Sequence, residues 1–257
     1  MTDSRLTRWP SAPKIDPKAD NSIRSVSQDE IKEILDAHWL YLETDRKQGV
    51  RAHLGSTDLS GMDFTKMNLR LIRMDHAVLE GANLSHANLR GANLVGARLP
   101  RALVVEADLS RARLSGANLA AANFDGSDFS EADMEFALAP DSMFRKAVLN
   151  SADMSGIILD GADLSGADMR SANLRGAAFH KAKLDKADLR KARLGGAVLI
   201  GASMRNADLR GAYLRLTKLA GADLRGADLR EALHLTREQI DSANCDRETK
   251  WSISHGR

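Results

Sequence analysis

A bulky apolar residue recurs at every fifth position through most of this chain. The series begins at Leu54, ends at Leu229 and has 36 members, of which 24 are Leu, five are Phe and five are Met. The residue two places earlier is Ala in 28 of the 36 units, and 15 of the 19 glycines lie two places later. A register kept over such a length indicates a repeat architecture.

A period of five fits neither a regular strand nor a regular helix. In a strand, successive bulky residues would alternate between the two faces, and on a helix they would spiral around the axis. If the bulky residue is position i, an extended piece from i−2 to i followed by a corner at i+1 and i+2 restores one inward face. Glycine suits such a corner at i+2 because turns use backbone angles that other residues resist.

Repeated corners wind the chain into stacked coils, and the outward charges predict four sides for each coil. At a spacing of 20 residues the charges fall into one aspartate column and one arginine column, whereas a three-sided coil would mix unlike residues. Four units per coil give about nine coils and a rod roughly 43 Å long, at the usual spacing between strands. Ala at i−2 and the bulky residue at i fill the interior, so we expect a packed core and no channel.

Runs such as ANLSHANLRGANLVGA and ADLRGADLREA resemble the pentapeptide-repeat family, whose signature is A(D/N)LXX. The resemblance covers residues 52–232. It implies an all-β solenoid, a right-handed quadrilateral parallel β-helix, over that range. It implies little about activity, since the best-understood members of the family bind other proteins.

The segments before the repeats predict a flexible tail over residues 1–26 and an amphipathic capping helix over 27–49. Ser27 and Glu30 form a capping-box pattern. Apolar residues then follow at helical spacing: Ile31, Ile34, Leu35, His38, Trp39 and Leu42. We expect this stripe to cover the open first coil, with His38 packed in the core; the alternative is a helix that binds a partner.

Residues 233–257 predict a second cap followed by a tail. Thr236 with Gln239 forms another capping box, and Leu235 with Ile240 forms a hydrophobic staple, so a short helix should span Arg237 to Ala243. In the quinolone-resistance branch of the family, C-terminal helices join two rods. The resemblance therefore implies a dimer contact as the alternative to a cap, through these residues: Leu233, Leu235, Ile240 and Trp251.

Composition narrows the classes of function. The 37 basic and 35 acidic residues give a formal net charge of +2, which argues against a surface built wholly to bind or to imitate a polyanion. The single cysteine, Cys245, excludes an internal disulfide. The chain shows no apolar run long enough to span a membrane and no secretory signal, so we expect a soluble cytoplasmic protein.

Candidate chemistry is absent from the repeat frame. The histidines lie far apart, and no phosphate-binding loop, dinucleotide fingerprint or nucleophile elbow appears. Asp or Asn fills position i−1 in 19 of the 36 units, where a short acceptor can bond a turn N–H group, so these carboxylates are structural. We predict no catalytic residues, no cofactor site, no metal site and no enzymatic activity.

Two outward columns are candidate sites. The first is a charged ladder, which the alternating signs make either a solvated lattice of ion pairs or a comb for phosphates. It consists of Asp168, Arg170, Asp188, Arg190, Asp208, Arg210, Asp228 and Arg230. The second, which we call the apolar strip, places apolar residues where the repeat prefers Asp or Asn, and contiguous outward apolar residues often mark a contact. It consists of Leu138, Ile158, Ala178 and Val198 at i−1, with Ile200 beside them.

The leading hypothesis is a non-catalytic scaffold that displays residues on a rigid rod to a protein partner, either another protein or a second copy. The alternative is a DNA-mimicking, quinolone-protection-type protein that binds DNA topoisomerase (gyrase), and the balanced charge of the rod counts against it. Direct binding of nucleic acid by the arginine column is disfavoured because the aspartates cancel most of its field.

Overall fold

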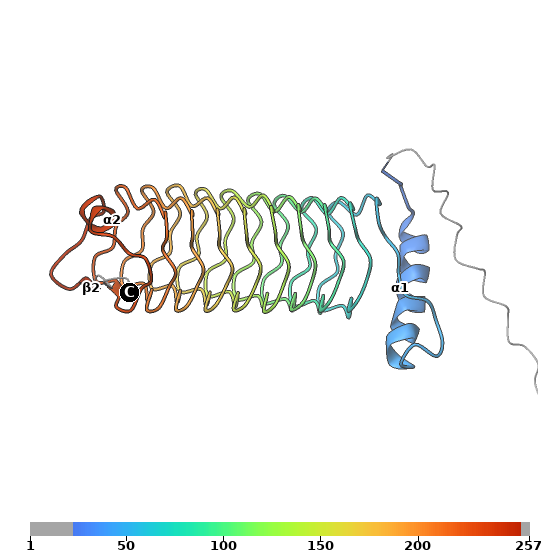
Figure 1. The fold of residues 1–257 in the computed structure, drawn as a ribbon. Helices are drawn as coiled ribbons and strands as arrows, with labels where there is room; N and C mark the ends of the chain where they lie inside the picture. Colours follow the sequence, from blue (N-terminus) through green and yellow to red (C-terminus); the bar gives the residue numbers. More distant parts are fainter. Residues whose placement is uncertain (1–22, 253–257) are drawn as a thin grey trace, which may run out of the picture.

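The computed structural model describes residues 23–252 as a rod of stacked coils with a helix at each end (Figure 1). Parallel bridges join outward i−1 residues that lie 20 positions apart, from His53 with Arg73 through to Tyr213 with Leu233. A step of 20 residues between stacked positions means four five-residue sides per coil, as the outward charges predict. Each side is too short for a longer strand, so the chain contributes one bridging residue per side.

Each corner is a tight turn with a left-handed residue at i+2. All 36 of these residues have positive φ, and 21 of them are not glycine. Gly81, for example, has φ 63°, and the N–H of Ala82 donates to the carbonyl of Leu79 at 3.1 Å. This is the turn geometry that requires positive φ at its third residue, which explains the preference for glycine.

The interior is filled by the Ala and bulky positions, as the repeat predicts. Leu189 and Ala187 are 0% and 1% exposed, and most of their counterparts are equally buried. One coil departs from the Leu pattern and carries Phe124, Phe129, Met134 and Ala139. The three larger side chains compensate for the small Ala139, and the rings of Phe124 and Phe129 meet edge to face at 5.3 Å.

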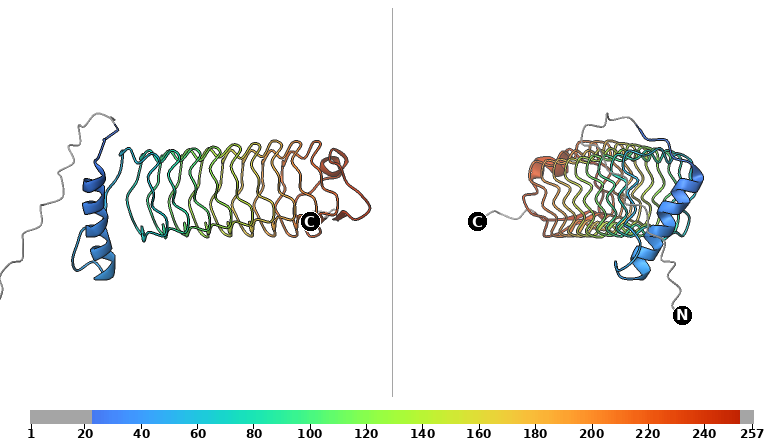
Figure 2. Two further views of the ribbon diagram at one scale, coloured as in Figure 1. Left: turned by 180° about the vertical axis from the view of Figure 1, so that it is seen from behind. Right: turned by 90° about the vertical axis from the view of Figure 1, so that its right-hand side faces the viewer.

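Helix α1 (Gln28–Glu43) crosses the open end of the first coil (Figure 2). Ile31 is buried, and Ile34 and Leu35 pack against the core. The predicted apolar stripe is wrong at Trp39, which is 57% exposed because it faces away from the coil. Met67, at an i−2 position of the first coil, also stays 39% exposed.

The boundaries of this N-terminal segment differ from the sequence prediction. The helix ends at Glu43, where Thr44 caps it, rather than at Gly49. The hydroxyl of Ser27 accepts from the Glu30 N–H at 3.2 Å, but the Glu30 carboxylate binds Arg24, so half of the predicted capping box forms.

The end of the predicted tail joins the β-helix. Arg24 donates its N–H to the carbonyl of Ser56 at 2.7 Å and accepts from Asp58 at 2.9 Å, so it occupies the place of a preceding coil. The remainder of the predicted tail, residues 1–22, lies outside the described residues.

The C-terminal segment folds back over the last coil. Helix α2 (Arg237–Asp241) ends two residues earlier than predicted, and both hydrogen bonds of its capping box, between Thr236 and Gln239, are present. Strand β1 (Asp228–Leu229) pairs in parallel with strand β2 (Lys250–Trp251). The final residues of the predicted tail, 253–257, are outside the part of the chain that the structure describes.

His38 links α1 to the rod. Its side chain is 1% exposed, and Nδ1 accepts a hydrogen bond from the Ala52 N–H at 3.2 Å. Burial lowers the pKa of His38, and burial is also the main cause that lowers the pKa of His53. The neutral ring is therefore the form that fits this contact.

The packed interior makes a stability prediction. Leu189→Ala should reduce the free energy of unfolding by about 2–5 kcal/mol, since it leaves a cavity. Ala187→Leu should cost about 1–3 kcal/mol because the added methylenes overfill the interior. Guanidinium unfolding followed by circular dichroism measures both, and exposed Arg193→Ala, expected within about 0.5 kcal/mol of wild type, is the control. Equal effects for Leu189→Ala and Arg193→Ala would contradict the packed core.

The lowered pKa of His38 makes the docking of α1 sensitive to acid. Below about pH 6.5, the ordinary value, a released His38 binds a proton that the docked form resists, so docking should weaken as pH falls. Amide hydrogen exchange, corrected for the intrinsic pH effect, should show loss of protection in α1 between pH 7.5 and 5.5 while the middle coils keep theirs. His38→Gln should remove the difference, whereas His53→Gln should retain it; if His38→Gln behaves like wild type, His38 is not the responsible group.

Candidate interaction faces

The apolar strip forms a continuous column on one face of the rod. Parallel bridges connect Leu138 to Ile158, Ile158 to Ala178 and Ala178 to Val198. Leu138 is 44% and Ile158 37% exposed, while Ala178 and Val198 are half-buried. Ile200, at the corner that follows Val198, is 39% exposed. The structure therefore brings all five sequence-predicted residues together.

Two large residues beside the strip escaped sequence reasoning, which searched the i−1 positions and the corner that follows them, where Ile200 lies. Phe136 and Leu216 are 63% and 76% exposed, and both occupy the left-handed i+2 position of the corner that precedes this face. The ring of Phe136 covers Gly156 of the next coil, since a Cβ built there would meet a ring carbon at 2.5 Å. A bulky apolar residue at a position that favours glycine is the signal that could have found both.

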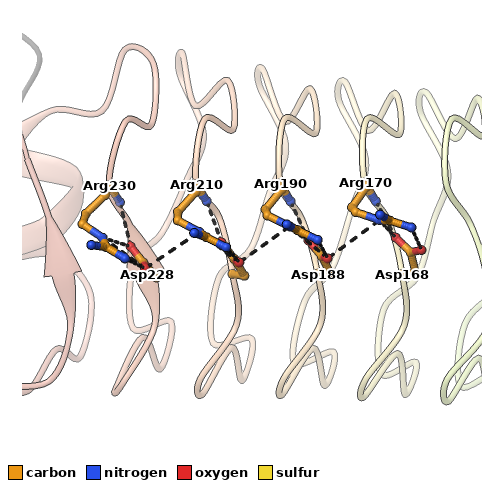
Figure 3. Close-up of polar contacts among 8 residues, drawn as sticks. Asp168, Arg170, Asp188, Arg190, Arg210, Asp228 and Arg230 are labelled. Carbon is orange, nitrogen blue, oxygen red and sulfur yellow. Dashed lines mark hydrogen bonds and ion pairs between the residues drawn. The ribbon is translucent and has the colours of Figure 1, made fainter.

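The charged ladder is a regular lattice of ion pairs (Figure 3). Arg190 Nη2 lies 2.6 Å from Asp188 Oδ2 in its own unit, and Arg190 Nε lies 3.7 Å from Asp208 Oδ2 in the next coil. The contact within the unit repeats at the other three arginines: Arg170, Arg210 and Arg230. All eight predicted residues thus lie together.

Internal pairing uses much of the hydrogen-bonding capacity of the ladder. Asp208 Oδ1 accepts from both the backbone N–H and Nε of Arg210, at 3.1 and 2.9 Å. Hydrogen bonds from Arg210 hold the pKa of Asp208 below its ordinary value. The same acceptor geometry at the backbone supports the structural role predicted for Asp at i−1. The ladder column lies two sides, or ten residues, from the apolar strip, so the two occupy opposite faces.

The described surface shows shallow hollows and no convergent metal-binding cluster. One groove of about 380 Å³ runs beside the ladder. It is lined by Asn150, Ser151, Arg170, Ser171, Arg190 and Lys191. Within residues 23–252, no group of three or more His, Cys, Asp or Glu side chains is placed to hold a metal ion. A search of the same residues for a helix long and apolar enough to cross a membrane finds none.

The predicted cap-or-dimer residues divide into a buried pair and a more accessible pair. Leu235 and Ile240 are 3% and 5% exposed and belong to the core cluster. Trp251 packs partly against the core, with the guanidinium carbon of Arg237 5.2 Å from its ring centroid. Leu233 is 48% exposed. The buried pair contacts this chain's own core, so Leu233 is the best placed of the four for contact with another molecule.

These features define a repeat protein with a four-sided parallel β-helix. The sequence model of the family described as pentapeptide repeats matches in eight copies, over residues 72–103, 106–138, 140–166, 157–196 and 192–231. The chain therefore belongs to the pentapeptide-repeat family, as its resemblance implied. The right-handed quadrilateral β-helix is the fold of this family, and its members are generally non-enzymatic scaffolds.

Solved structures with similarity to this chain are also pentapeptide-repeat proteins. HetL, from the cyanobacterium Nostoc sp. strain PCC 7120, is involved in heterocyst differentiation regulation and is 29% identical, with 85% of this chain and 94% of HetL covered and a TM-score of 0.41. A trypsin-treated form of QnrB1, a plasmid-mediated fluoroquinolone resistance protein, is 20% identical, with coverage of 76% and 92% and a TM-score of 0.45. The protein alr5209 from Nostoc PCC 7120 is 35% identical over 40% of this chain and 84% of its own, with a TM-score of 0.35. A comparison with curated proteins gives no match.

The geometry of the ladder predicts a small effect on stability. Asp208→Asn keeps an acceptor for the Arg210 N–H and removes the charge, so the free energy of unfolding should fall by less than about 1 kcal/mol. Chemical unfolding at low and high salt measures this, and high salt should narrow the difference. Asp208→Leu, which also removes the acceptor, is the comparison. A loss above about 2 kcal/mol for the Asn variant would mean that the ladder supports the fold.

Proposed function

We propose that this protein is a non-catalytic interaction scaffold that binds a protein through the face carrying the apolar strip. The observation that carries the proposal is the clustering of large exposed apolar side chains on one face of the rod, whereas Met67, Leu103 and Leu233 are exposed singly on other sides. Phe136, Leu138, Ile158 and Leu216 retain from 37% to 76% of their accessible surface. Burying that surface against a protein would be favourable, since apolar area removed from water contributes roughly 25 cal/mol per Å².

The rigidity of the rod supports a role in display. Successive side chains of the strip belong to hydrogen-bonded neighbours, with Leu138 donating its N–H to Ala117 at 2.8 Å and Ile158 donating to Ala137 at 3.0 Å. A partner therefore meets apolar groups at fixed intervals and need not order a loop. The packed interior supports the same view because binding at such a rod takes place on its outer faces.

We further propose that the ends serve the rod. In this proposal the β-helix of residues 52–232 has about nine coils, α1 and its flanking residues 27–49 cap the first, and the segment from residue 233 caps the last. The buried Ile31 at one end and the buried Leu235 and Ile240 at the other support it. Stacked coils need such covers, since an open end exposes apolar side chains and unpaired backbone groups.

The topoisomerase-binding alternative has less support. A rod that imitates DNA needs accessible negative charge. Asp188, Asp208 and Asp228 each contact the arginine of their own unit and the ladder arginine of the preceding coil. A gyrase supercoiling assay with and without a quinolone would revive this alternative if added protein changed the result.

Substitution on the strip tests the proposed function. Ile158→Asp should abolish binding of proteins that co-purify with the wild-type chain from its native cells, because a charge would be buried at the contact. Leu103→Asp is the matched control, since Leu103 also occupies position i−1 and is 46% exposed, but on another side of the coil. Far-UV circular dichroism should be unchanged in both variants. Unaltered binding by folded Ile158→Asp would reject the strip as the site.

A further inference from the structure

The charges around the apolar strip are distributed unequally along the rod. From the coil of Leu138 onward, the N-terminal part of the face is bordered by acidic side chains and the C-terminal part by basic ones, while Arg98 and Arg101 lie on coils before the strip. The acidic residues are Glu135, Asp141 and Asp160; the basic ones are Arg175, Lys181, Arg215 and Lys218. All except the half-buried Asp160 are exposed. Such a face complements a copy of itself that runs in the opposite direction, because each acidic end then meets a basic end.

Two copies in antiparallel contact are related by a two-fold axis that lies across the rods. The apolar positions of the two copies also match when this axis passes midway between the coils of Ile158 and Ala178. Coils equidistant from the axis then face each other across the interface. Leu138 lies opposite Val198 of the second copy, and Ile158 opposite Ala178 of the second copy, so the four residues of the column pair completely. Pro140 and Ile200 both lie at the corner that follows the strip positions. By the same rule, Pro140 lies opposite Ile200 of the second copy.

The two large corner residues meet glycines in this arrangement. Phe136 lies at the level of Gly196 of the second copy, and Leu216 at the level of Gly116 of the second copy. A Cβ built on Gly196 or on Gly116 meets nothing within 4 Å, so the surface there is open. Each protruding side chain therefore has a flat place to occupy, as in the packing of knobs against small residues.

The same axis avoids contacts between like charges. Because it passes between coils, no side chain faces itself, and Asp160 lies opposite His180 of the second copy. A parallel pairing keeps each residue at its own level and exchanges the two edges of the face. It would set Glu135 near Asp141 of the second copy and Lys218, which continues the column of the strip, opposite Lys218 of the second copy, and like charges repel.

We propose that two copies of this chain associate face to face and antiparallel through the apolar strip, with Phe136 and Leu216 at the margins of the contact. This inference rests on the proposed function, since it names the partner of the same face. The apolar column with its two marginal residues spans five coils, or about 24 Å of rod. A contact of that length is small for a stable dimer, so the dimer should dissociate on dilution.

Sedimentation velocity over a concentration series tests association. Wild-type protein should shift from monomer to dimer as its concentration rises. Ile158→Asp should weaken association by about tenfold or more, while the control Leu103→Asp should change it by less than about twofold. Wild-type protein that stays monomeric at every concentration would overturn the proposal.

Cross-linking tests the direction. In a Cys245→Ser background, Leu138→Cys and Val198→Cys chains are prepared separately and mixed with a short thiol-specific cross-linker. The mixture should form cross-linked dimers, whereas each chain alone should not, since equivalent residues lie three coils, about 14 Å, apart along the rod. Links that form in each chain alone, and in the mixture only between identical chains, would indicate a parallel dimer and reject the arrangement.

The two tests separate this inference from the proposed function. If the wild-type chain is monomeric but Ile158→Asp still loses a co-purified protein, the scaffold function stands and self-association is wrong. If Ile158→Asp changes neither association nor co-purification, both proposals fail.

Discussion

The left-handed residue at each corner is the constraint on which the rest of the structure depends. Positive φ at i+2 lets the chain turn after three extended residues and close a hydrogen bond such as that from Ala82 to Leu79. Only this reset brings every fifth residue to the same inward side. The 20-residue ladder, the packed interior and the outward columns all follow, because a coil of four identical corners returns to its starting direction.

The interior and the outer faces are under different physical requirements. An inward position must match the space left by its coil, as the large Phe124 and Phe129 do beside the small Ala139. An outward i−1 position must only form its bridge, which any residue with a backbone N–H can do. Side-chain identity there is limited by solubility and by the local hydrogen bond that Asp208 makes to Arg210. The ladder residues satisfy both limits, because they are charged and bond to one another. The apolar strip on the opposite face satisfies neither limit, and this difference makes the strip the stronger candidate for a binding site.

The sequence predicted the features that depend on the five-residue period, and it predicted less of those outside the repeats. The four-sided coil and the burial of Leu189 follow from regular spacing, because one unit's geometry repeats in all the others. Trp39 and the end of α1 could not be derived in this way, since they depend on how one helix meets one open coil. Arg24 could not be predicted to pair with the first coil either, because it belongs to no repeat. The strip was found as a break in the pattern at i−1, and Phe136 and Leu216 were missed because the i+2 corner positions were judged by their turn geometry alone.

A rod of equal sides gains specificity through the order of its outward residues. Regular coils place each side chain at a fixed height, so a sequence read along one column is also a distance scale along one face. On the face that carries the strip, Phe136 lies three coils from Gly196, and Leu216 lies five coils from Gly116. The two pairs share the same midpoint along the rod. Irregular surfaces rarely offer such a test, because their side chains have no common register. In this fold, residue numbers alone can reveal that a face is complementary to a second copy of itself. Two such faces associate only if the free energy gained by burying their apolar surface exceeds the free-energy cost of bringing two rods together.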